Sequence, residues 1–297
     1  MPAPQNLSFH TCDVFTERRY GGNPLAVVHD ADALSDQQMQ AIAREFNYSE
    51  TVFVLPPADP QHHARARIFT PLRELPFAGH PTVGTAFVLA TCSPELAGAG
   101  RIVLEEGVGP VTVELEWTAA GLGRCVFSAP RLPQPGPRAP RREELAAMLG
   151  LNPSQVLDSA QFWSCGVPYL VVPLASVAAL QRCRLDPVVW SDVLNAYESR
   201  MVYPVAHAGS AWRVRMFAPD AGVPEDPATG SAAAAFAGWL ANYAPEATSR
   251  SEYTLLQGEE MGRPSRIDLQ IDRDGDRVTA VRVGGASVMV SQGTFLV

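Results

Sequence analysis

Three ionisable side chains, Glu50, His80 and Asp226, could perform acid/base chemistry. His80 and Asp226 each precede a proline and a segment of small, apolar residues, and Glu50 directly precedes the predicted strand Thr51–Leu55. A carboxyl group removed from water has its pKa raised towards neutrality, so Glu50 could both donate and accept a proton. His80 and Asp226 could orient a substrate or relay that proton. The three residues therefore form a candidate catalytic group.

Each of these residues also has an ordinary structural interpretation. A glutamate such as Glu50 is more commonly a solvated loop carboxylate. A single histidine such as His80 is more commonly a structural side chain whose hydrogen bonds are satisfied. The catalytic interpretation depends on the three side chains sharing one cleft.

The segment Phe77–Thr85 has a near-copy later in the chain, Glu225–Ser231. His80-Pro81 aligns with Asp226-Pro227, Gly84 with Gly230, and Thr85 with Ser231, always at a shift of 146 positions. Both segments continue into runs of small, apolar residues, and a helix that is apolar on every side belongs inside a core. The pattern predicts two buried central helices.

Both segments resemble helix starts. Proline is tolerated at the first helical position, which Pro81 and Pro227 would occupy, and the Asp226 carboxylate could accept from first-turn amides. A helix amino end carries about half a positive charge and free amide donors, so two such ends facing one cleft would suit a carboxylate. The alternative is that both helix ends are capped for structural reasons alone.

Further repeats support an internal duplication. Gly22–Val28 is similar to Gly166–Val172 at a shift of 144, and Arg65–Pro71 is similar to Arg213–Pro219 at a shift of 148. Glu50 aligns with an arginine, Arg200, so the acid is present in one copy only.

Local signals predict the elements that position these residues. Ser35 and Gln38 form a capping box, which predicts a helix over 36–46. Five prolines between Ala129 and Pro140 predict a stiff, extended linker at the domain boundary. Other helices are expected at 143–149 and 186–196. Strands are expected at 7–15, 25–28, 51–55, 64–69, 101–104, 111–117, 125–127, 161–164, 201–205, 253–256, 266–271, 278–283 and 287–290.

Composition restricts the function classes. The 297 residues carry a formal net charge of −8 without a basic cluster, which argues against nucleic-acid and anionic-membrane partners and favours a small molecule. The first ten residues do not resemble a secretory signal, and no apolar run approaches the ~20 residues of a membrane helix. Five scattered cysteines indicate free thiols in a reducing cytoplasm.

Metal and cofactor motifs are not indicated. His62-His63 lacks cysteine or acidic ligands at zinc spacing. Gly121-Leu-Gly123 lacks the third glycine and the following helix of a dinucleotide-binding motif. We therefore expect a protein that uses no metal and no cofactor.

Taken together, these segments resemble one known family, the PhzF phenazine-biosynthesis isomerases. The resemblance spans nearly the whole chain and is carried by Gly22-Asn-Pro24, Asn47-Tyr-Ser-Glu-Thr51, Leu75-Pro-Phe-Ala-Gly-His-Pro81, Asp226-Pro-Ala-Thr-Gly-Ser231 and Gln257-Gly-Glu-Glu-Met-Gly-Arg-Pro-Ser265.

The resemblance implies an α+β, diaminopimelate-epimerase-like fold of two similar domains, each a curved mixed sheet rolled around a central helix and related by a pseudo-twofold axis. The amino-terminal domain would comprise residues 1–128 with a returning strand at about 286–297, and the carboxy-terminal domain residues 129–285, with the active-site cleft between them. It also implies a homodimer.

The same resemblance implies a cofactor-independent proton shift on a small, cyclic carboxylic acid. Glu50 would be the main acid/base and His80 and Asp226 would assist. Gly79, Gly230 and Ser231 would hold the substrate carboxylate.

The related epimerases and racemases use a cysteine at each helix start, and this chain has none there, which disfavours two-thiol racemisation; Cys165 is interpreted as a buried thiol. One alternative is an amino-acid epimerase or racemase that uses carboxylates instead. Another is a non-catalytic binding or scaffold protein with this fold.

Overall fold

The computed structural model describes residues 6–244 and 248–297, so the start of the segment analysed for a secretory signal, Met1–Gln5, lies outside the described residues. The chain divides into two compact units, Met1–Pro130 with Gly284–Val297 and Arg131–Val283. No helix in the described part of the chain is long and apolar enough to cross a membrane.

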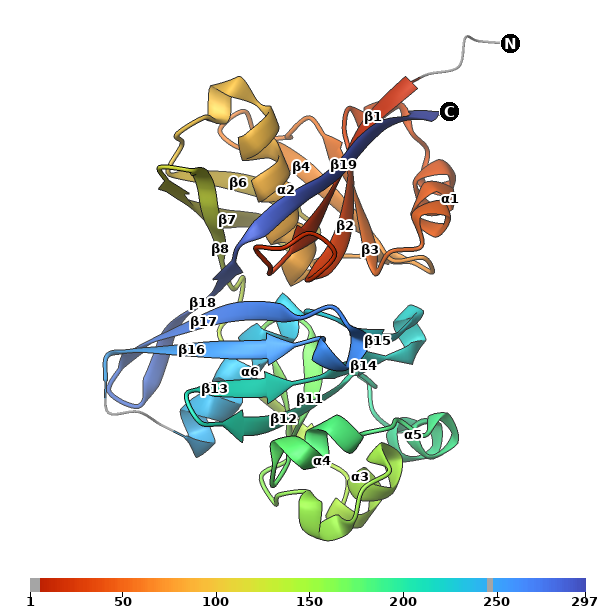
Figure 1. The fold of residues 1–297 in the computed structure, drawn as a ribbon, viewed down its shortest axis with the longest axis vertical. Helices are drawn as coiled ribbons and strands as arrows, with labels where there is room; N and C mark the ends of the chain where they lie inside the picture. The colour runs from red at the N-terminus through yellow and green to blue at the C-terminus, as the bar shows by residue number, and fades with distance from the viewer. Residues whose placement is uncertain (1–5, 245–247) are drawn as a thin grey trace. The chain divides into compact units, whose positions relative to one another are not determined.

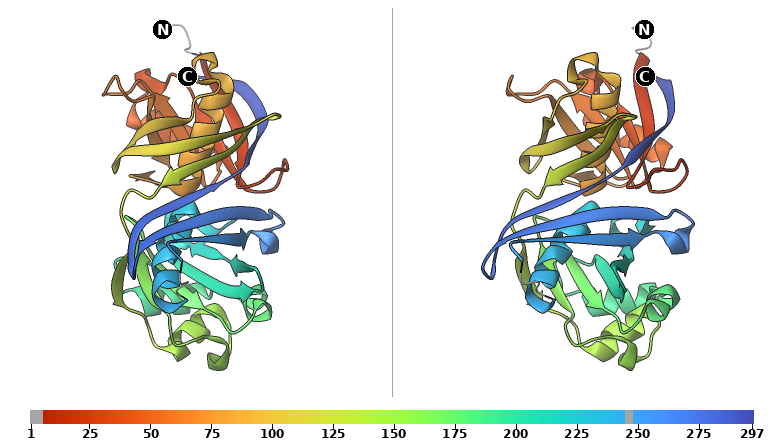
Figure 2. Two further views of the ribbon diagram at one scale, coloured as in Figure 1. Left: turned by 90° about the vertical axis from the view of Figure 1, so that its left-hand side faces the viewer. Right: turned by 60° about the vertical axis from the view of Figure 1, so that its left-hand side comes forward.

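The first unit contains the amino-terminal half of the chain and the last strand. Its helices are α1 (Asp36–Phe46) and α2 (Gly79–Cys92). Its strands are β1 (Asn6–Val14), β2 (Asn23–Val28), β3 (Glu50–Leu55), β4 (Ala64–Phe69), β5 (Glu74–Leu75), β6 (Arg101–Glu106), β7 (Gly109–Thr118), β8 (Gly121–Ser128) and β19 (Ser287–Leu296). Figures 1 and 2 show β19 running antiparallel beside β1.

The second unit has more helices. They are α3 (Arg142–Leu149), α4 (Val177–Arg182), α5 (Pro187–Leu194) and α6 (Gly230–Tyr243). The strands are β9 (Gln134–Arg138), β10 (Gln161–Ser164), β11 (Pro168–Pro173), β12 (Val202–Ala208), β13 (Ala211–Val214), β14 (Met216–Ala218), β15 (Val223–Asp226), β16 (Arg250–Gln257), β17 (Ser265–Asp274) and β18 (Arg277–Gly285), whose end crosses the unit boundary. In Figure 1, α3, α4 and α5 gather at one end of this unit.

The two units share one order of strand pairing. In the first unit β1, β2, β3, β4, β6 and β7 are joined in sequence by antiparallel, parallel, antiparallel, parallel and antiparallel pairs. In the second, β10, β11, β12, β13, β16 and β17 repeat this order and these directions. The predicted duplication is thus confirmed.

A buried central helix lies within each unit. Residues Gly79–Ala90 of α2 and Gly230–Leu240 of α6 are all buried. In its own unit, α2 packs against β1, β2, β3, β6, β7, β8 and β19, and α6 packs against β9, β10, β11 and β17. The all-round apolar pattern therefore predicted two core helices correctly.

The predicted alignment of the two helix starts is wrong. Both helices have 14 residues, but α2 begins at Gly79 and α6 at Gly230, which is a shift of 151 rather than 146. Pro81 is the third residue of α2, where its missing N–H is tolerated because the first four amides have no partner within the helix. Pro227 lies three residues before α6, so neither proline occupies the first position.

Other local predictions have mixed outcomes. The Ser35–Gln38 capping box is present, and α1 has the predicted bounds. The linker is not wholly irregular, because β9 forms within it and pairs with β10. The helix α4 was not predicted, and α5 is shorter than expected, starting after Asp186, whose carboxylate accepts from two amides of the first turn.

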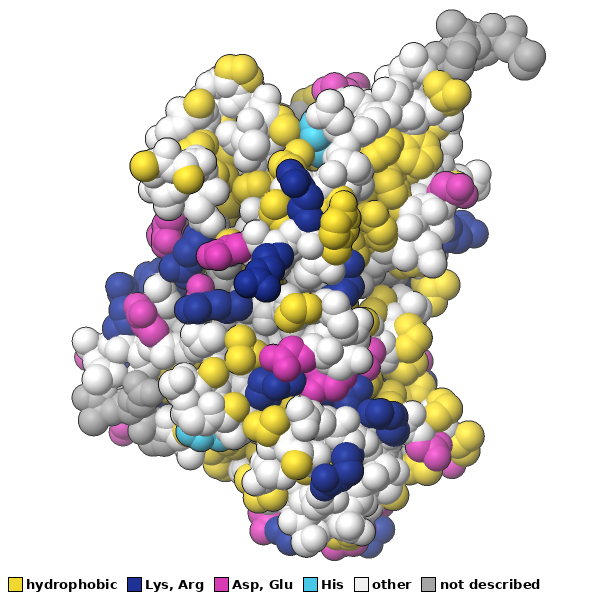
Figure 3. Space-filling view, viewed as in Figure 1, with side chains coloured by type: hydrophobic (Ala, Val, Ile, Leu, Met, Phe, Trp, Pro, Cys, Tyr) yellow, Lys and Arg dark blue, Asp and Glu magenta, His cyan; other side chains and the backbone are white. Residues whose placement is uncertain are grey.

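Charged side chains on the face drawn in Figure 3 lie intermixed, with acidic and basic groups adjoining one another. Among the ion pairs of the described residues, the Asp272 carboxylate accepts from both Arg250 and Arg282. Such pairing weakens any single-sign field over this surface.

Candidate active site

In the first unit, Glu50 and His80 lie together at the start of α2. The parallel pairing of β2 and β3 brings the first residues of both strands, Asn23 and Glu50, close to His80. His80 Nδ1 lies 3.1 Å from Asn23 Nδ2 and 3.4 Å from Glu50 Oε2. The side chains of Glu50 and His80 are only 14% and 3% exposed, so their interaction takes place largely away from water.

The contacts of His80 with Asn23 and Glu50 converge on Nδ1. This nitrogen holds at most one proton: it either donates to the Glu50 carboxylate or accepts from a donor. The tautomer of His80 and the protonation of Glu50 are therefore coupled. Such coupling is what a proton relay between the two groups requires.

The imidazole of His80 is neutral near physiological pH. Burial lowers its pKa to about 3, a shift that the backbone carbonyl of Pro24 opposes. A neutral ring can accept and donate at different nitrogens, whereas a protonated ring can only donate. His80 can therefore assist proton transfer without introducing a fixed positive charge.

We expect this burial to make the protein less stable in acid. Because the pKa of His80 falls from 6.5 in the unfolded chain to about 3 in the fold, its contribution to stability is lost as pH drops from about 6.5 towards 3. The slope for this one group is about 1.4 kcal/mol per pH unit. Urea unfolding between pH 4 and pH 7 should show a steeper acid dependence for the wild type than for His80→Asn, and equal slopes would contradict a neutral, buried His80.

In the second unit, Asp226 belongs to a buried polar cluster. Asp226 ends β15, and its Oδ2 accepts from the Thr229 hydroxyl at 2.5 Å. Gln257 Nε2 donates to Thr229 Oγ1 at 3.0 Å and to the Asp226 carbonyl at 2.8 Å. All three side chains are less than 10% exposed. Asp226 is therefore held before α6 by side-chain contacts. It had been predicted to cap the first turn of α6, but the N-cap residue is Thr229.

Ser231 is held by a tyrosine. Its hydroxyl lies 2.7 Å from the hydroxyl of Tyr169 on β11, and both residues are buried. Burial raises the pKa of Tyr203 well above its usual value, so the Tyr203 hydroxyl is neutral. Tyr169 and Tyr203 both belong to the surroundings of Asp226 and Ser231.

The starts of α2 and α6 share one property relevant to anion binding. Neither of their N-cap residues, Ala78 and Thr229, caps its helix with a side-chain hydrogen bond. Glycine occupies the first helical position in both, at Gly79 and Gly230. The positive end of each helix dipole is therefore not offset by a capping carboxylate.

The predicted residues fall into two groups, one in each unit. Glu50, Gly79 and His80 lie together in the first unit, whereas Asp226, Gly230 and Ser231 belong to the second. Sequence reasoning did not identify the residues that hold these groups, namely Asn23, Tyr169, Thr229 and Gln257. Asn23, Thr229 and Gln257 do occur in the motifs that suggested the family, which was the available signal.

No cysteine lies at the start of α2 or α6, where it could act as a catalytic thiol. All five cysteines are free, and Cys165 is buried with its thiol donating to the Ala234 carbonyl. Burial raises the pKa of Cys165 to about 12, so it stays a thiol at neutral pH. The interpretation of Cys165 as a buried thiol is confirmed.

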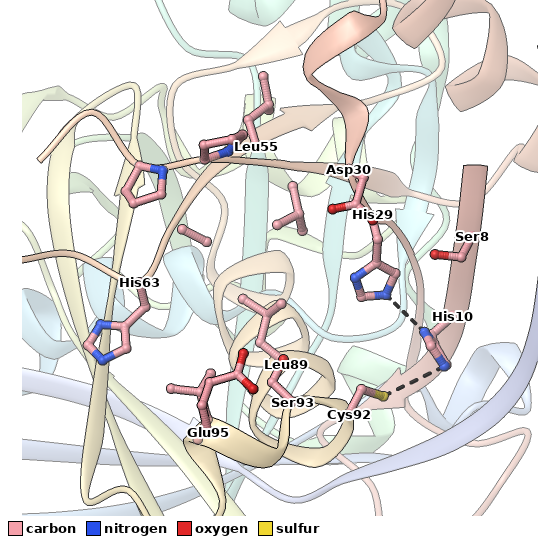
Figure 4. A pocket seen from close by; sticks show the side chains of 15 residues that line it. Ser8, His10, His29, Asp30, Leu55, His63, Leu89, Cys92, Ser93 and Glu95 are labelled. Atoms are coloured by element: carbon pink, nitrogen blue, oxygen red, sulfur yellow. Dashed lines mark hydrogen bonds between the residues drawn. The ribbon is translucent and has the colours of Figure 1, made fainter. Parts of the chain in front are cut away.

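A separate cavity of about 540 Å³ lies near the carboxyl end of α2. In Figure 4, His10 bridges two partners, with Nδ1 2.9 Å from His29 Nε2 and Nε2 3.6 Å from Cys92 Sγ. These donors do not converge on one point, and no group of three or more His, Cys, Asp or Glu side chains in the described chain is placed to hold a metal ion.

Residues 12–293 match a family model described as phenazine biosynthesis-like protein. The chain belongs to this family.

Several of its relatives are named as isomerases. The chain is 44% identical to an uncharacterised isomerase of Mesorhizobium japonicum, over 99% of this chain and 100% of that protein. It is 39% identical to trans-2,3-dihydro-3-hydroxyanthranilate isomerase of Pseudomonas aeruginosa, over 95% of this chain and 96% of that protein. The phenazine biosynthesis-like chain described here is therefore an isomerase.

Solved structures agree with the family assignment. A PhzF-family phenazine biosynthesis protein of Bacillus anthracis has a TM-score of 0.87 at 25% identity, covering 99% of this chain and 100% of that one. A hydroxyproline epimerase from Agrobacterium vitis has the same fold, with a TM-score of 0.66 at 11% identity over 99% and 92% of the two chains. The fold is thus the predicted diaminopimelate-epimerase-like one.

Proposed function

We propose that this isomerase moves a proton between two carbon atoms of a small, cyclic carboxylic acid and that Glu50 is the group that moves it. The observation that carries the proposal is the contact between Glu50 and the neutral, buried His80 at the uncapped start of α2. A general acid/base and an anion-binding helix start are thereby adjacent in one unit.

The proposed step conserves atoms and electrons. The Glu50 carboxylate removes a proton from one carbon, and the electron pair of the broken C–H bond enters the conjugated system of the substrate. The protonated Glu50 then returns the proton to another carbon, and a C–H bond forms there. His80 stays neutral and stabilises whichever protonation state Glu50 holds, through the contact at Nδ1.

The substrate carboxylate would be held by helix amino ends. In the first unit we assign this role to the backbone around Gly79, beside Glu50 and His80. In the second unit, the family resemblance assigns carboxylate binding to Gly230 and to the Ser231 hydroxyl, which Tyr169 orients, and an assisting role in proton transfer to Asp226. Residues of the chain thus provide both the acid/base and the anion binding that the reaction needs.

The relative from Pseudomonas aeruginosa supplies the first substrate to test, since its name specifies trans-2,3-dihydro-3-hydroxyanthranilate, a cyclic amino acid. The purified protein should convert this compound, or a closely related cyclic acid, in buffer made with D₂O. Spectrophotometry would follow turnover, and NMR would locate solvent deuterium in the product.

The position of the deuterium distinguishes the alternatives. Deuterium at a new carbon, with the double bonds shifted, supports the proposal. Deuterium at the original carbon with inverted configuration would favour an epimerase. Failure to turn over any cyclic or acyclic carboxylic acid in a broad panel would favour a non-catalytic member of the fold.

A further inference from the structure

The strands β6 and β16 end at equivalent positions of the two units, each beside its central helix. Glu106 is the last residue of β6 and Gln257 the last residue of β16, and a glycine follows each of them. Each lies 27 positions after the first residue of its central helix, from 79 to 106 and from 230 to 257. Because β6 and β16 also have equivalent partners, Glu106 and Gln257 occupy the same place in the duplicated fold.

The contacts of Gln257 show what this position does in the second unit. Its amide nitrogen donates to the Thr229 hydroxyl, and its amide oxygen accepts from the Thr229 backbone N–H at 3.2 Å. The Thr229 hydroxyl in turn donates to Asp226. The strand end therefore orders the segment that carries Asp226 and leads into α6.

Glu106 also contacts a threonine in the first unit, but this threonine is the fourth residue of α2, whereas Thr229 is the N-cap residue of α6. Glu106 Oε1 lies 2.7 Å from Thr82 Oγ1, and that hydroxyl lies 2.8 Å from the carbonyl of Ala78. The threonine hydroxyl has one proton, and the Ala78 carbonyl can only accept. When Glu106 is ionised, the single hydroxyl proton is shared between the two acceptors. When Glu106 is neutral, its own O–H can donate to Thr82 Oγ1, as Gln257 donates from its amide, and the threonine proton goes to the Ala78 carbonyl.

The surroundings of Glu106 favour this neutral form. Glu106 is 8% exposed, and its Oε2 has no hydrogen-bond partner among the described residues. Burial raises its pKa to about 8, although the Thr82 hydrogen bond acts in the opposite direction.

Charged groups near Glu106 do not offer it a dedicated counter-ion. The charged side chains that share a cavity of about 500 Å³ with it are Arg65, Arg67, Glu74 and Glu105. Arg67 is bound by Glu74 and Asp36, Arg65 is exposed, and Glu105 accepts from His62 and two backbone amides. On α2 the titratable group nearest in sequence to Thr82 is His80, which is neutral.

The loop after Glu106 is also fixed against the segment before α2. Val108 N–H donates to the Pro76 carbonyl at 3.1 Å. A Cβ atom at Gly107 would lie 2.7 Å from Pro76 Cα, so this close approach requires glycine. Glu106 is therefore attached to a rigid support next to the residues that precede His80.

We propose that Glu106 is a positioning residue, a neutral carboxylic acid whose hydrogen bond to Thr82 fixes the first turn of α2 and so places Gly79 and His80. Gln257 performs the same task for Thr229 and Asp226. The catalytic consequence rests on the function proposed above, whereas the protonation of Glu106 and the ordering of the turn do not.

The test compares Glu106→Gln with Glu106→Ala and Thr82→Val. Glutamine retains a donor and nearly the shape of the neutral acid, so Glu106→Gln should keep kcat within about threefold of the wild type at pH 7. Glu106→Ala and Thr82→Val should lower kcat by about tenfold, the loss expected when one hydrogen bond that places the catalytic groups is removed. Above pH 8 the wild type should lose activity about tenfold per pH unit as Glu106 ionises, and Glu106→Gln should lack this decline. Equal impairment of the Gln and Ala variants, or an unchanged alkaline limb in Glu106→Gln, would overturn the proposal.

Two readouts remain decisive if none of the proteins turns over the substrate. Between about pH 4.5 and 8 the unfolded chain ionises at Glu106 and the fold does not, so the folding equilibrium constant of Glu106→Gln relative to the wild type should rise tenfold per pH unit. A ratio independent of pH would show that Glu106 is ionised in the fold.

Hydrogen exchange at the amides of residues 82–85 should be unchanged in Glu106→Gln and faster in Glu106→Ala and Thr82→Val. Unchanged exchange in all three variants would refute the positioning role.

Discussion

Replacing Glu50 by glutamine is expected to lower kcat by about 10³-fold with little change in folding or substrate binding. The substitution preserves the shape of the side chain next to His80 but removes the group that accepts and returns the proton. Losses of 10² to 10⁴ are usual when a general acid/base is removed. Steady-state kinetics and thermal unfolding of the same preparations provide the measurement, and a thermal shift with a bound substrate analogue reports binding.

A matched control is available on α1. Glu45 is exposed and lies five residues before Glu50, so Glu45→Gln changes the net charge by the same amount without touching the site. It should leave kcat unchanged. A kcat for Glu50→Gln within threefold of the wild type would eliminate Glu50 as the acid/base and direct attention to Asp226.

Replacing Arg215 by alanine is expected to destabilise the second unit by about 3–5 kcal/mol. Arg215 is 3% exposed and forms a bidentate pair with Glu225, with contacts of 2.7 and 2.8 Å. It also donates to the carbonyls of Leu180 and Cys183 at the end of α4. The large cost is expected because removing Arg215 leaves the Glu225 carboxylate, whose side chain is only 21% exposed, without its counter-ion. The substitution also removes a donor from each of the carbonyls of Leu180 and Cys183.

Urea unfolding followed by tryptophan fluorescence measures this effect, because four of the five tryptophans lie in the second unit. The control is Arg250→Ala, which removes an arginine with a 55% exposed side chain from its pair with Asp272 and should cost under about 1 kcal/mol. Since Glu225 directly precedes Asp226, Arg215→Ala should also reduce turnover. A loss below 1 kcal/mol for Arg215→Ala would show that the pair contributes little to holding β15.

Much of the fold could be predicted from the sequence because it depends on local or repeated patterns. The Ser35–Gln38 capping box needs only neighbouring residues, and α1 has the predicted bounds. The apolar runs in α2 and α6 identified the core helices, since a helix without a polar face must be buried. The repeated segments indicated a duplication that the strand pairing confirms. The motifs indicated the family that the comparisons show.

The starting points of the helices were decided by tertiary contacts. The local rule for proline placed both starts incorrectly, because α2 begins where Thr82, Ala78 and Glu106 meet, and Asp226 is held by Thr229 and Gln257. Glu106 and Gln257 are 24 and 28 positions from their threonine partners, beyond the range of any helical or turn pattern.

The contacts of the candidate catalytic residues likewise depend on the fold. The sequence supplied the types of Glu50 and His80, but the contact between them exists because β2 and β3 pair in parallel beside α2. The pKa of His80 depends on burial, which no local pattern specifies. Residue types and local patterns thus determined which side chains are candidates for acid/base catalysis. Only long-range packing decided which residues they contact, whether they are protonated and where each central helix begins.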